Sequence, residues 1–177
     1  MSKLKVATVW LDGCSGCHMS FLDMDERILE LAKLIDVVYS PLVDAKDFPD
    51  EVDIALVEGA VASEDDEKKI EKVRAHSKTL VAMGDCAVTG NVPSMRNSIG
   101  PQAILERAYI ENADCQQQIP CIVVPRLLRV VKPIHEFVKV DVFLPGCPPS
   151  ADTFHTALTA LVTGEPLDIP ALTRFGA

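Results

Sequence analysis

The sequence predicts a three-layer α/β domain built on a flavodoxin-like, doubly wound parallel sheet. Short apolar runs rich in β-branched residues alternate with segments of helical periodicity, which is the pattern of successive βαβ units. Glycine or proline follows several of these runs, as expected where a strand passes into a loop. The chain has 177 residues, and no linker or internal repeat divides it. Residues 1–177 are therefore expected to form one domain.

Five apolar runs are the predicted strands of this sheet. They lie at 5–10, 36–40, 53–57, 79–83 and 140–144. Parallel neighbours need crossover connections, and the intervening segments are long enough to supply them.

Four segments between and after the strands are predicted helices. An apolar stripe at helical spacing predicts a helix over 19–35. Ser63 precedes four acidic residues, which is typical of a helix N-cap with an acidic first turn. Pro101 is expected to open a short helix to about residue 111, and Ser150 a last helix that Gly164 ends.

Composition limits the kinds of partner. The formal net charge of −9 argues against nucleic acid or an anionic membrane as the main partner. Apolar residues make up 48%, so a partner subunit is expected to cover part of the surface. Residues 87–139 show little periodicity and are the predicted irregular, partner-facing insertion. The sequence shows no targeting signal and no apolar run of about 18 residues, so we expect a cytoplasmic protein without direct membrane insertion.

Four of the six cysteines follow predicted strands. Cys14 and Cys17 lie in a glycine-bearing turn after the first strand, and Cys86 and Cys147 come just after the fourth and fifth strands. The carboxyl ends of parallel strands meet at one edge of a sheet, where ligands collect. Four thiolates at that edge match the ligand shell of an iron–sulfur cluster. The four cysteines are therefore candidate ligands of one cluster.

Two other kinds of site remain open. A structural zinc site also uses thiolates, but it usually combines two short-spaced pairs, whereas 60 residues separate Cys86 from Cys147. Cys14 and Cys17 between a strand and a helix also match a thioredoxin-type dithiol, which leaves the other two cysteines without a role. We favour the cluster, because a cysteine followed by proline, as at Cys147-Pro148, recurs in iron–sulfur proteins.

A few other residues carry weaker signals. Glu58 ends the third predicted strand and is a candidate proton relay, with a solvated or hydrogen-bonded turn residue as the alternative. His18 is expected to be an ordinary polar residue, and Trp10 a core or interface residue. Cys115 and Cys121 lie in the irregular insertion, away from any strand end, and are interpreted as buried or incidental thiols.

Four motifs resemble the small subunit of NiFe-hydrogenases. They are Trp10-Leu-Asp-Gly-Cys14-Ser-Gly-Cys17, Val57-Glu58-Gly59, Met83-Gly84-Asp85-Cys86-Ala87 and Leu144-Pro145-Gly146-Cys147-Pro148-Pro149. They occur in the family's order and are most similar to the cytoplasmic, bidirectional NAD-linked hydrogenases. The related subunit of complex I, a quinone oxidoreductase, is the alternative. It typically has adjacent cysteines at its first site, so the spacing of Cys14 and Cys17 favours a hydrogenase.

The resemblance implies one proximal 4Fe-4S cluster bound by Cys14, Cys17, Cys86 and Cys147. It further implies a NiFe large subunit as partner, together with a diaphorase module that carries more iron–sulfur clusters and flavin. The chain would then carry electrons between hydrogen chemistry and NAD. A flavin (FMN) within this chain is supported by no residue. Many exported relatives have Glu where this sequence has Gly13, so a proton route through such a Glu is not expected here.

Overall fold

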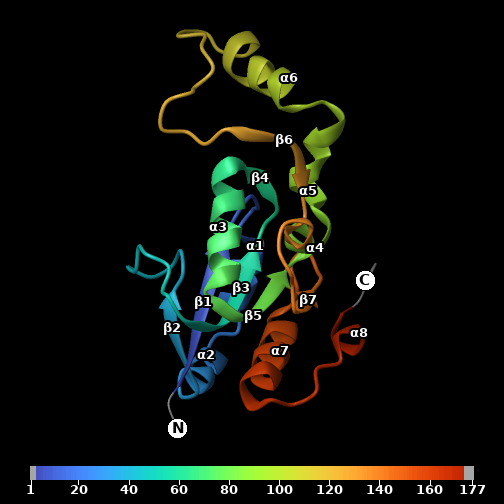
Figure 1. Ribbon diagram of the computed structural model, residues 1–177. Helices are drawn as coiled ribbons and strands as arrows, with labels where there is room; N and C mark the ends of the chain where they lie inside the picture. The colour runs from blue at the N-terminus through green and yellow to red at the C-terminus, as the bar shows by residue number, and fades with distance from the viewer. Residues whose placement is uncertain (1–2, 174–177) are drawn as a thin grey trace.

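Five parallel strands form the central sheet. The computed structural model describes residues 3–173. The strands are β1 (Leu4–Trp10), β2 (Ile35–Tyr39), β3 (Val52–Glu58), β5 (Ser77–Met83) and β7 (Val142–Leu144). They are ordered β2-β1-β3-β5-β7, and every neighbouring pair is parallel (Figure 1). This is the doubly wound order that reverses between β1 and β3, and it confirms the predicted fold class.

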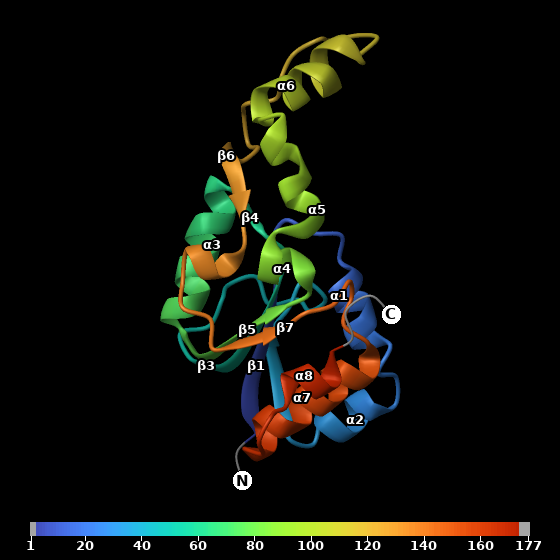
Figure 2. The same cartoon turned by 90° about the vertical axis from the view of Figure 1, so that its right-hand side faces the viewer.

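Helices cover both faces of the sheet, which gives three layers. They are α1 (Gly16–Leu22), α2 (Arg27–Leu31) and α7 (Ala151–Thr163) on one face and α3 (Glu64–Ala75) on the other (Figure 2). On the first face Phe21 meets Phe154 edge-on, with ring centroids 6.2 Å apart. On the second face Ile70 and Val73 of α3 are buried against the strands. Within residues 3–173, no helix is long and apolar enough to cross a membrane.

The single helix predicted over 19–35 is wrong. The chain forms α1 and α2 instead, separated by a turn in which Asp25 has a positive φ of 50°. Because the turn rotates the second helix relative to the first, the predicted apolar stripe does not form. Leu29 is 69% exposed, whereas Met24 in the turn is buried in the core.

The predicted caps of the other helices are confirmed. The Ser63 hydroxyl accepts a hydrogen bond from the Asp66 backbone, and the Asp66 carboxylate accepts one from Ser63 N, which is a capping box on α3. The Ser150 hydroxyl caps α7 by accepting a hydrogen bond from Thr153 N. Gly164 ends α7 in the left-handed conformation.

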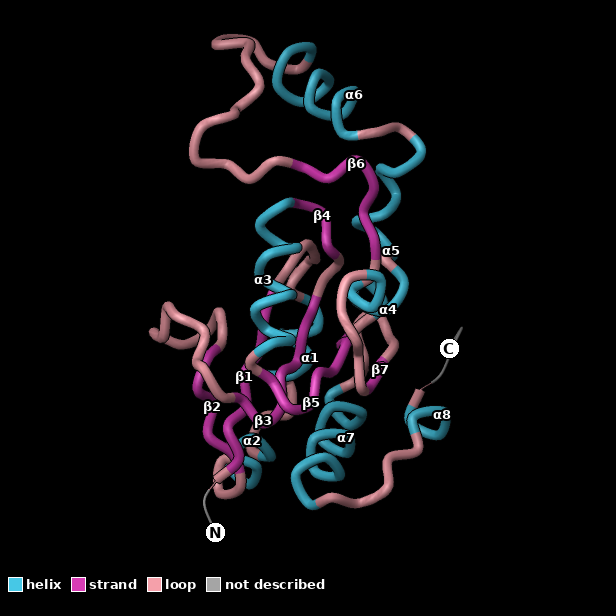
Figure 3. The backbone as a smooth tube through the Cα atoms, in the orientation of Figure 1, coloured by secondary structure: helices cyan, strands magenta, loops and turns pink. Residues whose placement is uncertain are grey.

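The region predicted as an irregular insertion contains more secondary structure than expected. Its elements are α4 (Asp85–Thr89), α5 (Asn91–Ser94), η1 (Met95–Ser98), α6 (Pro101–Glu106), η2 (Arg107–Glu111), β6 (Leu127–Lys132) and η3 (Ile134–Glu136). The helix expected to open at Pro101 is present. A long loop over 112–126 follows η2 and, together with α6, extends beyond the central sheet (Figure 3).

A second, two-stranded sheet in this region was not predicted. Here β6 pairs antiparallel with β4 (Val61–Ser63), which directly precedes α3. Asn97 bonds both the N–H and the C=O of Val131, at 2.7 and 2.9 Å, and Arg96 donates to Ala62 O and Leu128 O, each at 3.0 Å. These bonds join residues more than 30 positions apart, so local periodicity carries no sign of them.

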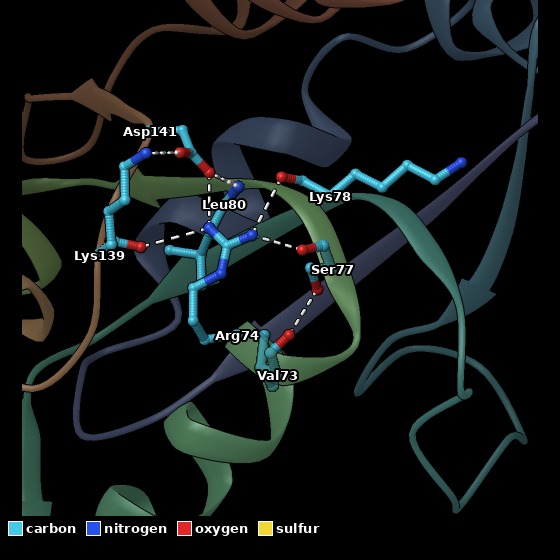
Figure 4. A network of polar contacts seen from close by, with 7 residues as sticks. All are labelled: Val73, Arg74, Ser77, Lys78, Leu80, Lys139 and Asp141. Atoms are coloured by element: carbon cyan, nitrogen blue, oxygen red, sulfur yellow. Dashed lines mark hydrogen bonds and ion pairs between the residues drawn. The ribbon is translucent and has the colours of Figure 1, made fainter.

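At the amino edge of the sheet, one arginine ties α3 to β5 and β7 (Figure 4). The Arg74 guanidinium donates to the Asp141 carboxylate at 2.6 Å and to the carbonyls of Ser77, Lys78 and Lys139. The same carboxylate accepts the Leu80 N–H at 2.9 Å. The network fixes the start of β5 relative to β7, at the end of the sheet opposite the strand-end cysteines.

Candidate metal centre

Three loops at the carboxyl edge of the sheet carry the four candidate ligands. Cys14 lies in the turn after β1, and Cys17 lies in the first turn of α1. Cys86 is the second residue of α4, just after β5, and Cys147 lies between β7 and α7. Cys17 is buried, Cys86 is half-buried, and Cys14 and Cys147 are exposed. The site therefore opens to the surface on one side.

Gly84 lets the loop after β5 approach the first cysteine pair. A Cβ atom at this position would lie 2.2 Å from Cys17 Sγ, which is far inside van der Waals contact. Gly84 also has a φ of +82°, a conformation that side chains with a Cβ rarely adopt. The motif needs glycine here both for the backbone turn and for the space that the sulfur fills.

Asp85 joins the loops that carry Cys86 and Cys147. Its backbone N–H donates to Gly146 O at 2.8 Å, and its carboxylate accepts the Gly146 N–H at 2.7 Å. Gly84 N also donates to Leu144 O at 2.8 Å, which extends the β5–β7 pairing to this point. These three bonds fix the two later cysteines relative to each other.

Glu58, at the end of β3, caps the helix that carries Cys17. Its two carboxylate oxygens accept the N–H groups of Cys17 and His18, at 3.4 and 3.0 Å, and it also bonds the His18 ring. Ser15, the residue at the N-cap position of α1, makes no capping bond with its own side chain. A carboxylate is well suited to this position, because the exposed N–H groups of a helix start carry partial positive charge.

His18 is not the ordinary polar residue expected at a helix start. It is 3% exposed, and its ring lies between the Glu58 carboxylate and the Thr8 hydroxyl, the latter 3.0 Å from Nε2. Thr8 in turn donates to Ser40 at 2.7 Å. Glu58 itself is 1% exposed, so the chain of hydrogen bonds runs inside the protein. Nothing in the residue spacing of β1, β3 and α1 indicates this contact.

The thiols influence one another through their charge. Burial raises the pKa of Cys17 far above its ordinary value, and the charges of Glu58, Cys86, Cys14 and Cys147 raise it further. Burial likewise raises the pKa of Cys86 to about 11, with Cys14 and Cys147 adding to the effect. The fold thus brings the four sulfurs into one electrostatic neighbourhood. A thiol with a raised pKa stays protonated at neutral pH unless a positively charged centre binds it.

The remaining predicted residues lie elsewhere or are more exposed than expected. Cys115 and Cys121 are on the loop over 112–126 and are exposed, which excludes the buried alternative and leaves the interpretation as incidental thiols. Trp10 is 43% exposed at the end of β1, which leaves an interface role rather than a core role. Across residues 3–173, no three His, Cys, Asp or Glu side chains lie close enough to hold one metal ion. A donor set of four thiols from three loops has the ligand chemistry of a cluster of several irons, in which each thiolate would bind a different iron.

Comparison with known proteins identifies relatives over nearly the whole chain. Residues 14–161 match the family described as NADH ubiquinone oxidoreductase, 20 Kd subunit. The NAD-reducing hydrogenase HoxS subunit delta of Cupriavidus necator is 42% identical over 174 residues, 96% of this chain and 83% of that subunit. A hydrogenase subunit of Methanocaldococcus jannaschii is 38% identical over 94% of this chain. The chain spans only 59% of the length of that archaeal relative.

Solved structures give the same result. A chain in the crystal structure of an NAD+-reducing [NiFe]-hydrogenase in the H2-reduced state matches with a TM-score of 0.92 and 39% identity, over 98% of this chain and 99% of that one. A [NiFeSe]-hydrogenase chain of Dm. baculatum shares the fold, with a TM-score of 0.60 at 21% identity. The chain therefore belongs to the NADH ubiquinone oxidoreductase 20 Kd subunit family, together with the small subunits of hydrogenases, and is a subunit of an oxidoreductase.

Proposed function

We propose that this chain is the electron-transfer small subunit of a bidirectional NAD-linked NiFe-hydrogenase, with one 4Fe-4S cluster bound by Cys14, Cys17, Cys86 and Cys147. The observation that carries the proposal is the gathering of four thiols from three strand-end loops at one edge of the sheet. When bound, the cluster supplies a carrier for one electron at a time. The similarity to the NAD-reducing hydrogenase subunit of Cupriavidus necator supports the link to hydrogen and NAD.

The chain's own residues orient and shield the ligands. Glu58 holds the first turn of α1, Gly84 leaves room for the Cys17 sulfur, and Asp85 fixes the loop of Cys147. A zinc ion would need its ligands about 2.3 Å away on all sides. The separation of Cys86 and Cys147 in the sequence, without a second short-spaced cysteine pair, favours a cluster over that alternative.

The contacts of Glu58 support a positioning role for this residue. Its described hydrogen bonds all go to the turn that carries Cys17 and to His18. A proton-relay role for Glu58 stays a prediction.

Exposed apolar side chains near the site support a docked partner. Val92, Met95 and Ile99 are 61%, 72% and 64% exposed on the segment that follows Cys86. Trp10 is exposed near the Cys14 turn. We infer that a NiFe large subunit covers this side, and that a diaphorase module with iron–sulfur clusters and flavin receives the electrons in the cytoplasm. A flavin in this chain has no supporting residue.

Iron and sulfide analysis of anaerobically purified protein tests the cluster. We expect about four irons and four labile sulfides per chain, with broad visible absorbance that bleaches on reduction. Cys86→Ser should lose them, and Cys115→Ser, a matched change on the exposed loop, should keep them. A single bound zinc without sulfide would refute the proposal, and so would equal iron loss in the two variants.

The electron-transfer role is tested in the assembled complex carrying Cys86→Ser. Reduction of NAD by hydrogen should collapse, because the path leads through the lost cluster. Hydrogen–deuterium exchange needs only the nickel–iron site and should survive. Normal hydrogen-to-NAD turnover, with cluster loss verified by iron analysis, would exclude the relay role.

A subunit of a quinone-linked complex is the alternative function, because the matching family is described as an NADH ubiquinone oxidoreductase subunit. Co-purification distinguishes the two functions. A nickel-bearing large subunit supports the hydrogenase, whereas quinone-reductase subunits support the alternative.

A further inference from the structure

One hydrogen-bond donor outside the cysteine motifs reaches a candidate ligand from α5. The Asn91 side-chain amide donates to Cys147 Sγ, with Nδ2 and the sulfur 3.5 Å apart. A segment that carries no cysteine thus supplies a donor to one of the two later cysteines.

The fold fixes this segment tightly. Gly90 N donates to Cys86 O at 3.0 Å, and Ser94 N donates back to Gly90 O at 3.1 Å. The Ser94 hydroxyl donates to Asn91 O at 2.7 Å. Asn91 has a positive φ of 30°, a region that asparagine adopts more readily than most residues. These contacts fix the backbone from which the Asn91 amide reaches Cys147.

The environment of the first cysteine pair is electrostatically opposite. The Glu58 carboxylate lies beside Cys17 and disfavours negative charge on its sulfur. The Asn91 amide, by contrast, places a hydrogen-bond donor on the Cys147 sulfur and favours negative charge there. Because reduction adds an electron whose charge spreads onto the thiolates, a donor on a thiolate stabilises the reduced cluster more than the oxidised one.

We propose that Asn91 is a positioning residue that raises the reduction potential of the cluster through its hydrogen bond to Cys147. The inference rests on the proposed function, since it requires the cluster. It assigns to Asn91 the task of keeping the cluster reducible in spite of the buried carboxylate of Glu58.

Redox titration of the anaerobically purified complex tests the inference. The signal of this cluster is identified as the one that Cys86→Ser lacks. Asn91→Gly removes the amide and keeps the positive φ accessible. We expect a more negative potential, by at least about threefold in the oxidised-to-reduced ratio at a fixed potential, where tenfold corresponds to about 59 mV for one electron. Asn91→Asp should shift it further in the same direction, because it adds a carboxylate.

Thr89→Val is the matched control. Thr89 is the last residue of α4, two positions before Asn91, and its hydroxyl donates to Asp85 O rather than to sulfur. The reduction potential of the cluster in this variant should therefore stay at the wild-type value. Equal potentials in wild type, Asn91→Gly and Asn91→Asp would overturn the inference and leave the proposed function intact. Loss of iron from both Asn91 variants but not from Thr89→Val would also overturn it, because Asn91 would then serve assembly. Wild-type protein without a cluster would refute the proposed function itself.

Discussion

Strands β5 and β7 are joined at both ends, but by different chemistry. At the amino edge, Asp141 accepts bonds from Arg74 and Leu80 N at 2.6 and 2.9 Å. At the carboxyl edge, Asp85 exchanges two hydrogen bonds with the backbone of Gly146. The contact at the amino edge is an ion pair between two side chains. The contact at the carboxyl edge involves mainly backbone groups, and Cys86 and Cys147 directly follow the two residues that make it.

The ionisation of the two edges differs accordingly. Burial alone would raise the pKa of Asp141, but the bond from Leu80 and the contacts with Arg74 lower it overall. The pKa of Asp53 is also lowered, mainly by its hydrogen bond with Lys78. At the carboxyl edge the pKa values of Cys17 and Cys86 are raised. The fold stabilises negative charge at one edge and opposes it at the other.

The largest expected effect comes from Gly84→Ala at the carboxyl edge. The new methyl group would meet Cys17 Sγ at 2.2 Å, so the protein should lose its iron almost completely. Gly164→Ala is the matched control, because Gly164 has a similar φ of +76° and no atom within 4 Å of the added carbon. It should cost about 1–2 kcal/mol of stability and retain iron. Full iron content in Gly84→Ala would contradict the close packing described for this loop.

Glu58→Gln should have the next largest effect. Glutamine has an NH2 group in place of one of the two carboxylate oxygens that accept the N–H groups of Cys17 and His18. One buried N–H group is therefore left without an acceptor. We expect a loss of about 2–3 kcal/mol in urea unfolding, with weaker iron retention. Glu136→Gln, at an exposed pair with Lys132, should change the unfolding free energy by less than about 0.5 kcal/mol. Equal losses of unfolding free energy in the two variants would exclude a capping role for Glu58.

Arg74→Met tests the amino edge. It removes the bonds to Asp141 and to three carbonyls, and should cost about 2 kcal/mol of unfolding free energy. The iron content of the folded protein should stay at the wild-type value, because the site lies at the opposite edge. Arg107→Met, in an exposed pair with Glu111, serves as the control and should be nearly neutral. Iron loss in Arg74→Met at unchanged stability would show that the two edges are coupled.

The smallest expected effect is the pH dependence of the stability that Asp141 contributes. The pKa of Asp141 is lower in the folded chain than its ordinary value of 3.8, so its stabilisation is present above that value and is lost as pH falls through the folded pKa. Asp141→Asn should therefore cost about 1 kcal/mol at pH 7, and the difference from the parent should shrink as pH falls and vanish once pH is below the lowered folded pKa. Both proteins would carry Cys86→Ser, so that acid loss of iron affects neither. A stability difference that persists at low pH would show that the shape of the side chain, rather than its charge, causes the effect.

Sequence patterns predicted the elements whose signals are local. The caps at Ser63 and Ser150 and the stop at Gly164 were correct, because each depends on residues within about four positions. The five strands were found within a few residues of their ends. The helix over 19–35 failed because a turn at Asp25 interrupts an otherwise helical pattern. The assignment of the four cysteines as cluster ligands stays a prediction.

By itself, the sequence determined the alternation of strands and helices, and with it the placement of four cysteines after three strands of one sheet. Only the tertiary structure decided how those loops are held. Glu58 reaches α1 across 41 positions, Asn91 reaches Cys147 across 56, and Asp85 reaches Gly146 across 61. The same holds for β6, whose partners are β4 and Asn97. Periodicity and capping signals act over one or two turns of chain, whereas these contacts exist only once the parallel sheet brings distant strand ends to a common edge.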